Sequence, residues 1–223
     1  MNWKTAYRSF YYESAPEPDD LILNLAETAM LSIDVQNTYS QISNDPVEAA
    51  RWEPFRQRMR EIVIPATCAL QDAFRAKGVD VIHARIACLL NDGRDRSLSQ
   101  KKPGWNNLLL PKDSKESQLI DDLAPKPGEI VVTKTTDSAL TGTNLRLILS
   151  NMGIRNVVMT GIFTDQCVSS TVRSLADESF NVIVVDDCCA AGTDELHQRE
   201  LEIINMIYCH VISSQELRYI MGL

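Results

Sequence analysis

The chain has 223 residues, 44% of them hydrophobic, which is enough to bury a sizeable core within one domain. Its formal net charge of −8 excludes nucleic acids and anionic membrane surfaces as expected partners. No stretch approaches the roughly 20 apolar residues of a membrane span, and the N-terminus lacks the apolar segment of a signal peptide. Six scattered cysteines without metal-type spacing are typical of reduced thiols, so we expect a cytoplasmic protein.

Short apolar, β-branched runs alternate with helical patterns along most of the chain. Residues 1–20 form an aromatic-rich arm, which we expect either to cross a neighbouring subunit or to pack on its own chain. Strands are predicted at 29–33, 79–85, 129–133, 156–160, 182–185 and 208–212. Helices are predicted at 55–74 (interrupted at Pro65), 114–123, 145–152, from Cys167 onward, and at 195–207, with loops at 37–50 and 89–113. This alternation predicts a single domain spanning 1–223, with residues 1–20 as its arm. It indicates an α/β fold, a three-layer α/β/α Rossmann-like sandwich around a mostly parallel sheet of about six strands.

Three chemically capable side chains follow predicted strands. Asp34 closes the first strand, Lys134 closes the strand at 129–133, and Cys167 stands at the junction of the fourth strand with a helix. Ligands and reacting groups gather beyond the carboxyl ends of strands in an open α/β sheet. A helix start also favours thiolate over thiol through its free N–H groups and dipole. Taken singly, the two charges read as solvated loop residues and Cys167 as a buried core residue; together they predict one catalytic crevice.

Three sequence blocks resemble one known family of enzymes. They read Leu31-Ser-Ile-Asp34-Val-Gln36-Asn37, then Val132-Thr-Lys134-Thr-Thr-Asp-Ser138-Ala, then Thr160-Gly-Ile-Phe-Thr164-Asp165-Gln-Cys167-Val168-Ser-Ser-Thr171. In order and spacing these blocks are similar to those of the isochorismatase-like cysteine hydrolases. That family includes nicotinamidases, N-carbamoylsarcosine amidohydrolase, ureidoacrylate amidohydrolase and biuret hydrolase, and the resemblance covers nearly the whole chain.

The resemblance implies a catalytic triad of Asp34, Lys134 and Cys167. Cys167 would attack a carbonyl carbon, Asp34 would take the thiol proton and pass it to the leaving group, and Lys134 would offset both negative charges. A cis peptide bond between Ile162 and Phe163 is implied as well. The N–H groups of Phe163 and Cys167 would then form the oxyanion hole. The implied strand order is 3-2-1-4-5-6.

Pocket residues are less sharply defined by the pattern. Gln36, Asn37 and Tyr39 follow Asp34 and are placed to reach it, and Phe163 is expected to wall the site. Thr164 and Asp165 are expected to cap the helix of Cys167. Asp137 would disfavour an anionic substrate if it faced the pocket, whereas Arg85, Arg94 and Arg96 would favour one if their segments folded over it.

Histidine placement limits the substrate. Nicotinamidases bind a metal through an aspartate and histidines after the second strand, but here that segment contains no histidine. His83, His197 and His210 lie on different predicted elements without metal-type spacing, although His83 could reach the pocket rim. We therefore predict no metal and no other cofactor. Isochorismatases proper, which cleave a vinyl ether, lack the nucleophilic cysteine that is present here.

The resulting hypothesis is a hydrolase that cleaves a C–N bond of a small non-peptide amide or ureido (carbamoyl) compound through a cysteine thioester, releasing ammonia or an amine. Nicotinamide-type amides remain an alternative substrate. A redox-sensing or ligand-binding protein that uses Cys167 without hydrolysis is the alternative from another class. A nucleotide or flavin binder is disfavoured because no Gly-x-Gly-x-x-Gly or phosphate loop follows a strand. The resemblance also implies a homodimer or homotetramer.

Overall fold

A computed structural model describes residues 1–104 and 108–223; Trp105, which belongs to the predicted loop at 89–113, lies outside the described residues. Six strands form one sheet in the order β3-β2-β1-β4-β5-β6, and every paired neighbour runs parallel. The strands are β1 (Thr28–Ile33), β2 (Asp80–Ile86), β3 (Ile130–Lys134), β4 (Asn156–Ile162), β5 (Asn181–Ala190) and β6 (His210–Ile212). The predicted fold class and strand order are confirmed.

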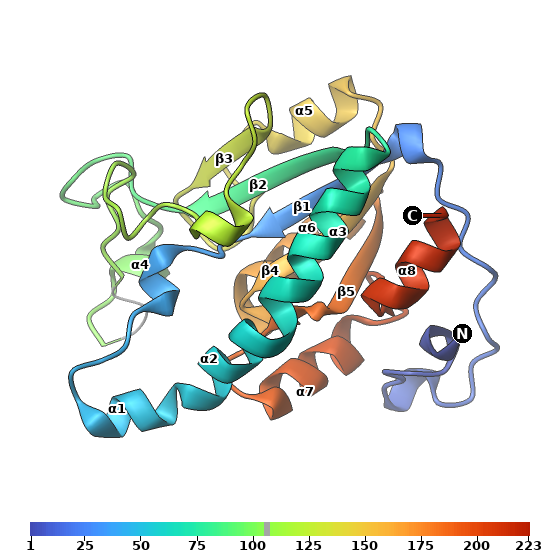
Figure 1. Cartoon of the computed structure of the whole chain (residues 1–223), viewed down its shortest axis with the longest axis horizontal. Helices are drawn as coiled ribbons and strands as arrows, with labels where there is room; N and C mark the ends of the chain where they lie inside the picture. Colours follow the sequence, from blue (N-terminus) through green and yellow to red (C-terminus); the bar gives the residue numbers. More distant parts are fainter. Residues whose placement is uncertain (105–107) are drawn as a thin grey trace.

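Eight α-helices accompany the sheet within the described residues (Figure 1). They are α1 (Pro46–Arg51), α2 (Glu53–Arg58), α3 (Ile64–Ala76), α4 (Leu98–Lys101), α5 (Leu145–Asn151), α6 (Ser169–Asp177), α7 (Asp194–Ile204) and α8 (Ser214–Met221). A turn of π-helix at Met59–Val63 separates α2 from α3, so the predicted helix is in two parts. None of the described helices is long and apolar enough to cross a membrane.

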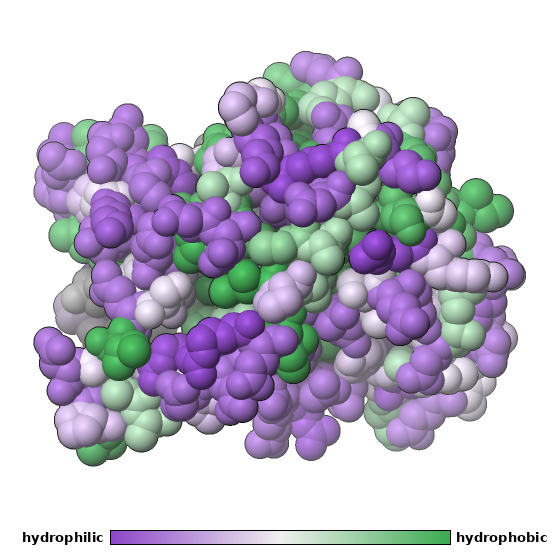
Figure 2. Space-filling model, in the orientation of Figure 1, coloured by the Kyte–Doolittle hydropathy of each residue, from purple (hydrophilic) through white to green (hydrophobic). Residues whose placement is uncertain are grey.

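Alternate strand residues divide the core into two layers. Leu31 of β1 packs in a cluster with side chains of α5, α6 and α7, whereas its neighbour Met30 packs with side chains of α3 and α8. Successive side chains of a strand point to opposite faces, so an apolar run such as 28–33 is buried on both. Figure 1 shows α3 and α8 in front of the sheet, and Figure 2 shows hydrophilic side chains over most of this outer face. The three-layer sandwich is therefore confirmed.

Three local predictions differ from the structure, and one of them is the predicted loop at 89–113, which contains the short helix α4. The segment 114–123 forms turns and a single short turn of 3-10 helix at Asp121–Leu123 instead of a helix. There the side chains of Ser117 and Gln118 donate hydrogen bonds to the backbone oxygen of Ser114, at 2.9 and 2.8 Å, and such local bonds compete with helix formation. The predicted loop at 37–50 contains the start of α1, whose N-cap is Asp45 with Pro46 directly after it.

The N-terminal arm packs on its own chain in its first residues. Trp3 is buried in the same cluster as α3 and α8, and Tyr7 donates a 2.8 Å hydrogen bond to Asp186. Phe10 and Tyr11 remain 82% and 84% exposed. The first residues of the arm therefore pack on their own chain, at the edge of the sheet formed by β6.

Candidate active site

The three predicted catalytic side chains meet at the carboxyl ends of β1, β3 and β4. Lys134 Nζ lies 2.7 Å from Asp34 Oδ2 and 3.3 Å from Cys167 Sγ. All three residues are buried, with exposed fractions of 1% for Asp34, 0% for Lys134 and 6% for Cys167. β1 and β4 are neighbours in the sheet, while the long side chain of Lys134 reaches across from β3.

All three N–H donors of the Lys134 ammonium have a hydrogen-bond partner. It donates to Asp34, to Cys167 and, at 3.2 Å, to the backbone oxygen of Thr136, and an ammonium has three donors. Asp34 Oδ1, by contrast, is buried and accepts no hydrogen bond of standard geometry. The site therefore keeps one carboxylate oxygen available beside the thiol.

The direction of the thiol pKa is opposite to the one predicted. Burial raises the pKa of the Cys167 thiol well above its ordinary value, the charge of Asp34 raises it further, and Lys134 opposes both. Burial alone would lower the pKa of Lys134, but Asp34 and Cys167 outweigh it and the pKa is raised. Burial raises the pKa of Asp34 as well, and Lys134 and Cys167 oppose that shift. The Cys167 thiol is thus harder to ionise than an ordinary cysteine, and Asp34 lies where it could take the thiol proton.

Gly161 allows β4 to approach β1 closely just before the cysteine. Its φ is +114°, and a Cβ at this position would lie 2.1 Å from the backbone oxygen of Ile33. No side chain fits there, so only glycine permits the contact. The next peptide bond, between Ile162 and Phe163, is cis.

The turn that carries Cys167 is π-helical and spans Thr164–Val168, directly before α6. It has no side-chain N-cap, so the predicted capping by Thr164 and Asp165 is wrong. Thr164 Oγ1 instead lies 2.8 Å from Nδ1 of the buried His197, and Arg58 donates to His197 Nε2 at 2.9 Å. Because Nε2 accepts, the ring proton lies on Nδ1 and is donated to Thr164; burial lowers the pKa of His197 to about 3. A neutral histidine therefore fixes the start of the turn.

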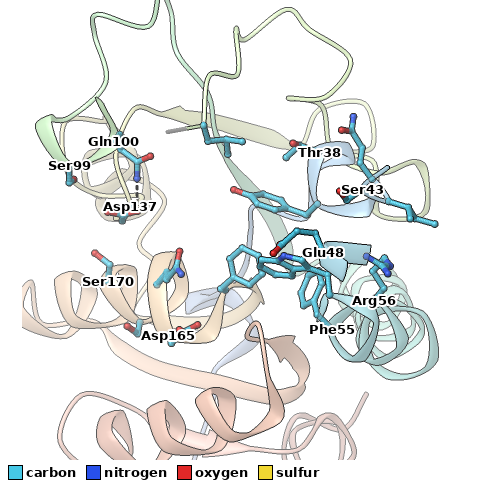
Figure 3. A pocket seen from close by; sticks show the side chains of 18 of the residues that line it. Thr38, Ser43, Glu48, Phe55, Arg56, Ser99, Gln100, Asp137, Asp165 and Ser170 are labelled. Carbon is cyan, nitrogen blue, oxygen red and sulfur yellow. Dashed lines mark hydrogen bonds between the residues drawn. The ribbon is translucent and has the colours of Figure 1, made fainter. Parts of the chain in front are cut away.

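A cavity of about 1030 Å³ opens over this turn. At one end it is lined by Asp137, Gln100, Ser99 and Ser170, and at the other by Thr38, Ser43, Glu48, Phe55 and Arg56 (Figure 3). Aromatic rings form much of the wall: the ring centroids of Tyr39 and Phe163 lie 5.2 Å apart, and those of Trp52 and Phe163 lie 5.9 Å apart. Asp34, Lys134 and Cys167 are not among the residues that line the cavity, but Cys167 Sγ lies 3.7 Å from Oδ1 of the lining residue Asp137.

The structure brings only some of the predicted pocket residues to this cavity. Tyr39 and Phe163 line it, but Gln36 and Asn37 do not. The buried amide of Gln36 bonds the backbone N and O of Ile86, at 3.0 and 2.9 Å, and Asn37 donates to the backbone oxygen of Lys115. Both side chains hold loops in place below the site.

The cavity is not lined by His83 or by the three arginines that the sequence left as possible pocket residues. His83 is buried against Glu129, so it does not reach the rim. Arg85, Arg94 and Arg96 each bond loop backbone or side-chain oxygens, and none lines the cavity.

Several lining residues were not predicted. They include Trp52, Phe55, Gln100 and Arg173. Phe55 begins a predicted helical stripe that reads as ordinary core, and Trp52 lies just before that stripe. A glutamine in a polar segment that is predicted as a loop carries no sequence signal. Among the residues that the structure describes, no group of three or more histidine, cysteine or acidic side chains could hold a metal ion; the prediction of no metal stays a prediction.

Comparison with known proteins agrees with this geometry. Residues 28–216 match the family model described as the Isochorismatase domain. The chain is 31% identical over 209 residues to the ureidoacrylate amidohydrolase RutB of Acinetobacter baylyi, covering 89% of this chain and 85% of that protein. It is 32% identical over 198 residues to the RutB of Pseudomonas savastanoi, covering 82% and 79%.

Solved structures share the fold. A cysteine hydrolase from Pseudomonas syringae superposes with a TM-score of 0.78 at 19% identity, covering 93% of this chain and 99% of that one. N-carbamoylsarcosine amidase from Thermoplasma acidophilum superposes with a TM-score of 0.64 at 23% identity, covering 84% and 96%. The chain belongs to the isochorismatase family, and it is an enzyme of the amidohydrolase kind, a hydrolase of C–N bonds in small amides.

Proposed function

We propose that Asp34, Lys134 and Cys167 are the catalytic residues and that hydrolysis proceeds through a thioester on Cys167. The observation that carries the proposal is the position of Lys134 Nζ between the two other groups, 2.7 Å from Asp34 Oδ2 and 3.3 Å from Cys167 Sγ. A buried ammonium at that point stabilises negative charge on either neighbour, whichever one holds the proton.

The sequence of proton transfers follows from the resting state. As Sγ bonds to the substrate carbonyl carbon, the thiol proton moves to Asp34 and the carbonyl oxygen becomes an oxyanion, which the N–H groups of Phe163 and Cys167 bind. When the C–N bond breaks, Asp34 returns the proton to the leaving nitrogen. A water molecule then gives a proton to Asp34 while its oxygen attacks the thioester carbon. When the C–S bond breaks, Asp34 returns this proton to Sγ, which restores the thiol and releases the acid.

Small amides and ureido compounds are the proposed substrates. The names of the RutB relatives and of the N-carbamoylsarcosine amidase describe proteins that act on ureido or carbamoyl groups. The products would be ammonia or an amine with the corresponding acid. We also propose a single domain over 1–223, a cytoplasmic location and a homodimer or homotetramer.

The alternative use of Cys167 as a redox sensor receives no support from the site. A sensor thiol needs a low pKa and exposure to oxidant, whereas burial raises the pKa of Cys167 and leaves it 6% exposed.

The test is ammonia release from a panel that contains nicotinamide, biuret, N-carbamoyl amino acids and ureidoacrylate. Wild type, Cys167→Ala and the matched control Cys68→Ala, a half-buried thiol outside the cavity, are compared. Turnover that persists in Cys68→Ala and disappears in Cys167→Ala supports the proposal, and mass spectrometry should detect an acyl adduct on Cys167 after a rapid acid quench. Turnover retained by Cys167→Ala contradicts it.

A further inference from the structure

A carboxylate stands next to the nucleophile at one end of the cavity. Asp137 Oδ1 lies 3.7 Å from Cys167 Sγ and accepts a 2.9 Å hydrogen bond from Nε2 of Gln100. Gln100 is 2% exposed, so its amide is held by the protein rather than by solvent. Figure 3 shows this pair side by side at the end of the cavity opposite Phe55 and Arg56. The carboxylate is therefore fixed where the substrate's reacting group must lie.

The cations that line the cavity are already paired. Arg56 Nη2 lies 2.7 Å from Glu53 Oε2, and Arg173 Nη1 lies 2.8 Å from Glu200 Oε1. They are the only lysine or arginine side chains among the described lining residues. Residues 105–107, outside the described part, carry no charge in the sequence.

The other charged side chains among the described lining residues are acidic. Besides Asp137 they include Glu48 and Asp165, and Glu48 pairs with Arg51 at the exposed rim. A substrate carboxylate near the scissile bond would thus face Asp137 with no unpaired cation to receive it. At about 4 Å, two like charges repel by about 1 to 4 kcal/mol at effective dielectric constants of about 80 to 20, which is an effect of about fivefold to about a thousandfold.

An amide or ureido group has the opposite relation to Asp137. Its N–H groups are donors, and a fixed carboxylate within a few ångströms of Sγ is an acceptor for them. The part of the substrate beyond that group would lie against Tyr39, Trp52 and Phe163, whose rings favour apolar or cationic groups.

We propose that Asp137 is a specificity-determining residue. Its carboxylate accepts an N–H of the scissile amide or ureido group and rejects substrates that carry a carboxylate close to that group. The substrate class is therefore an uncharged or cationic amide or ureide. This inference rests on the proposed function, and it separates this chain from a ureidoacrylate hydrolase, because ureidoacrylate carries a carboxylate.

The experiment uses three ureides of one shape. Propylurea, aminoethylurea and ureidopropanoate carry a methyl, an ammonium and a carboxylate group at the same position. For wild type, kcat/KM should be at least about fivefold higher for the first two than for ureidopropanoate. Asp137→Asn should shrink this ratio by about fivefold or more, and Gln100→Leu should shrink it less. The matched control Asp177→Asn, at the exposed end of α6, should leave it unchanged.

Failure of this inference and failure of the proposed function give different results. A wild-type preference for ureidopropanoate, or a ratio unchanged in Asp137→Asn, overturns the inference while turnover still supports the thioester mechanism. If none of the three is hydrolysed, their affinities for Cys167→Ala are measured by calorimetry. Tighter binding of the uncharged and cationic ureides then supports the inference, and equal or absent binding overturns it.

Discussion

Replacing Lys134 by methionine tests whether the buried ion pair holds the site together. Methionine has a similar length but no charge, so the change leaves the carboxylate of Asp34 buried without its partner. At 2.7 Å and an effective dielectric constant of about 20, the gross attraction lost is about 6 kcal/mol. Desolvation of the ammonium offsets part of this, and breaking one side of a buried pair costs about 3–5 kcal/mol net. We expect Lys134→Met to lose that much free energy of unfolding, together with all measurable turnover.

The free energy of unfolding of Lys134→Met should also depend on pH in a definite direction. Burial raises the pKa of Asp34, and Lys134 is the main group that opposes the shift, so the variant's folded pKa should rise further above the unfolded value. The folded chain then binds the proton more tightly than the unfolded chain. Stability relative to wild type should therefore recover as the pH falls below the raised pKa and decline as the pH rises through it.

Urea unfolding between pH 5 and pH 8 measures both effects. The double variant Asp34→Asn/Lys134→Met removes both charges and should regain most of the lost stability while remaining inactive. A single variant as stable as wild type, or a double variant no more stable than the single one, would refute the reasoning that the two charges are buried and mutually dependent.

Three further predictions follow from particular contacts. Gly161→Ala should lower the free energy of unfolding by about 3 kcal/mol or more, because its Cβ would lie 2.1 Å from the backbone oxygen of Ile33. Gly192→Ala, whose Cβ would have no atom nearer than 3.9 Å, is the matched control, and equal melting temperatures of the two variants would contradict the prediction. The rate at which iodoacetamide inactivates the wild type should keep rising above pH 9, because the pKa of the Cys167 thiol is raised above its ordinary value of 9.0. A rate that reaches a plateau below pH 8 would show a lowered pKa instead. His197→Leu should lower kcat about tenfold with little change in KM, because it removes the hydrogen bond that holds Thr164 at the start of the Cys167 turn. His197→Gln should lower kcat less, and a change in KM alone would argue against a positioning role for His197.

Much of the fold could be predicted because its signals are local. Buried parallel strands read as short apolar runs, and the residues that follow them, such as Asp34 and Cys167, are fixed in place by where each strand ends. The segment 114–123 could not be predicted in the same way. Its serine and glutamine side chains satisfy backbone oxygens in turns, and sequence spacing alone does not show which partner such a side chain will choose.

The pocket was predicted less well because its members depend on distant contacts. Gln36 follows Asp34 closely, yet it is used to bond Ile86, which is fifty positions away along the chain. Gln100 belongs to the short helix α4 and Asp137 to the loop after β3, so the two side chains meet only in the folded chain. Proximity in sequence to Asp34 therefore says little about which side chains line the cavity.

The thiol pKa shows how two correct principles can oppose each other. A helix start does favour the thiolate, but a helix dipole contributes only about 0.3–1 kcal/mol at an ordinary site. Burial and the nearby charge of Asp34 act on the same thiol in the opposite direction, and both depend on tertiary packing. Because the raised pKa disfavours the thiolate, the proposed mechanism assigns Asp34 the role of base. The free Oδ1 of Asp34 and the fully bonded ammonium of Lys134 are the arrangement that such a proton transfer requires.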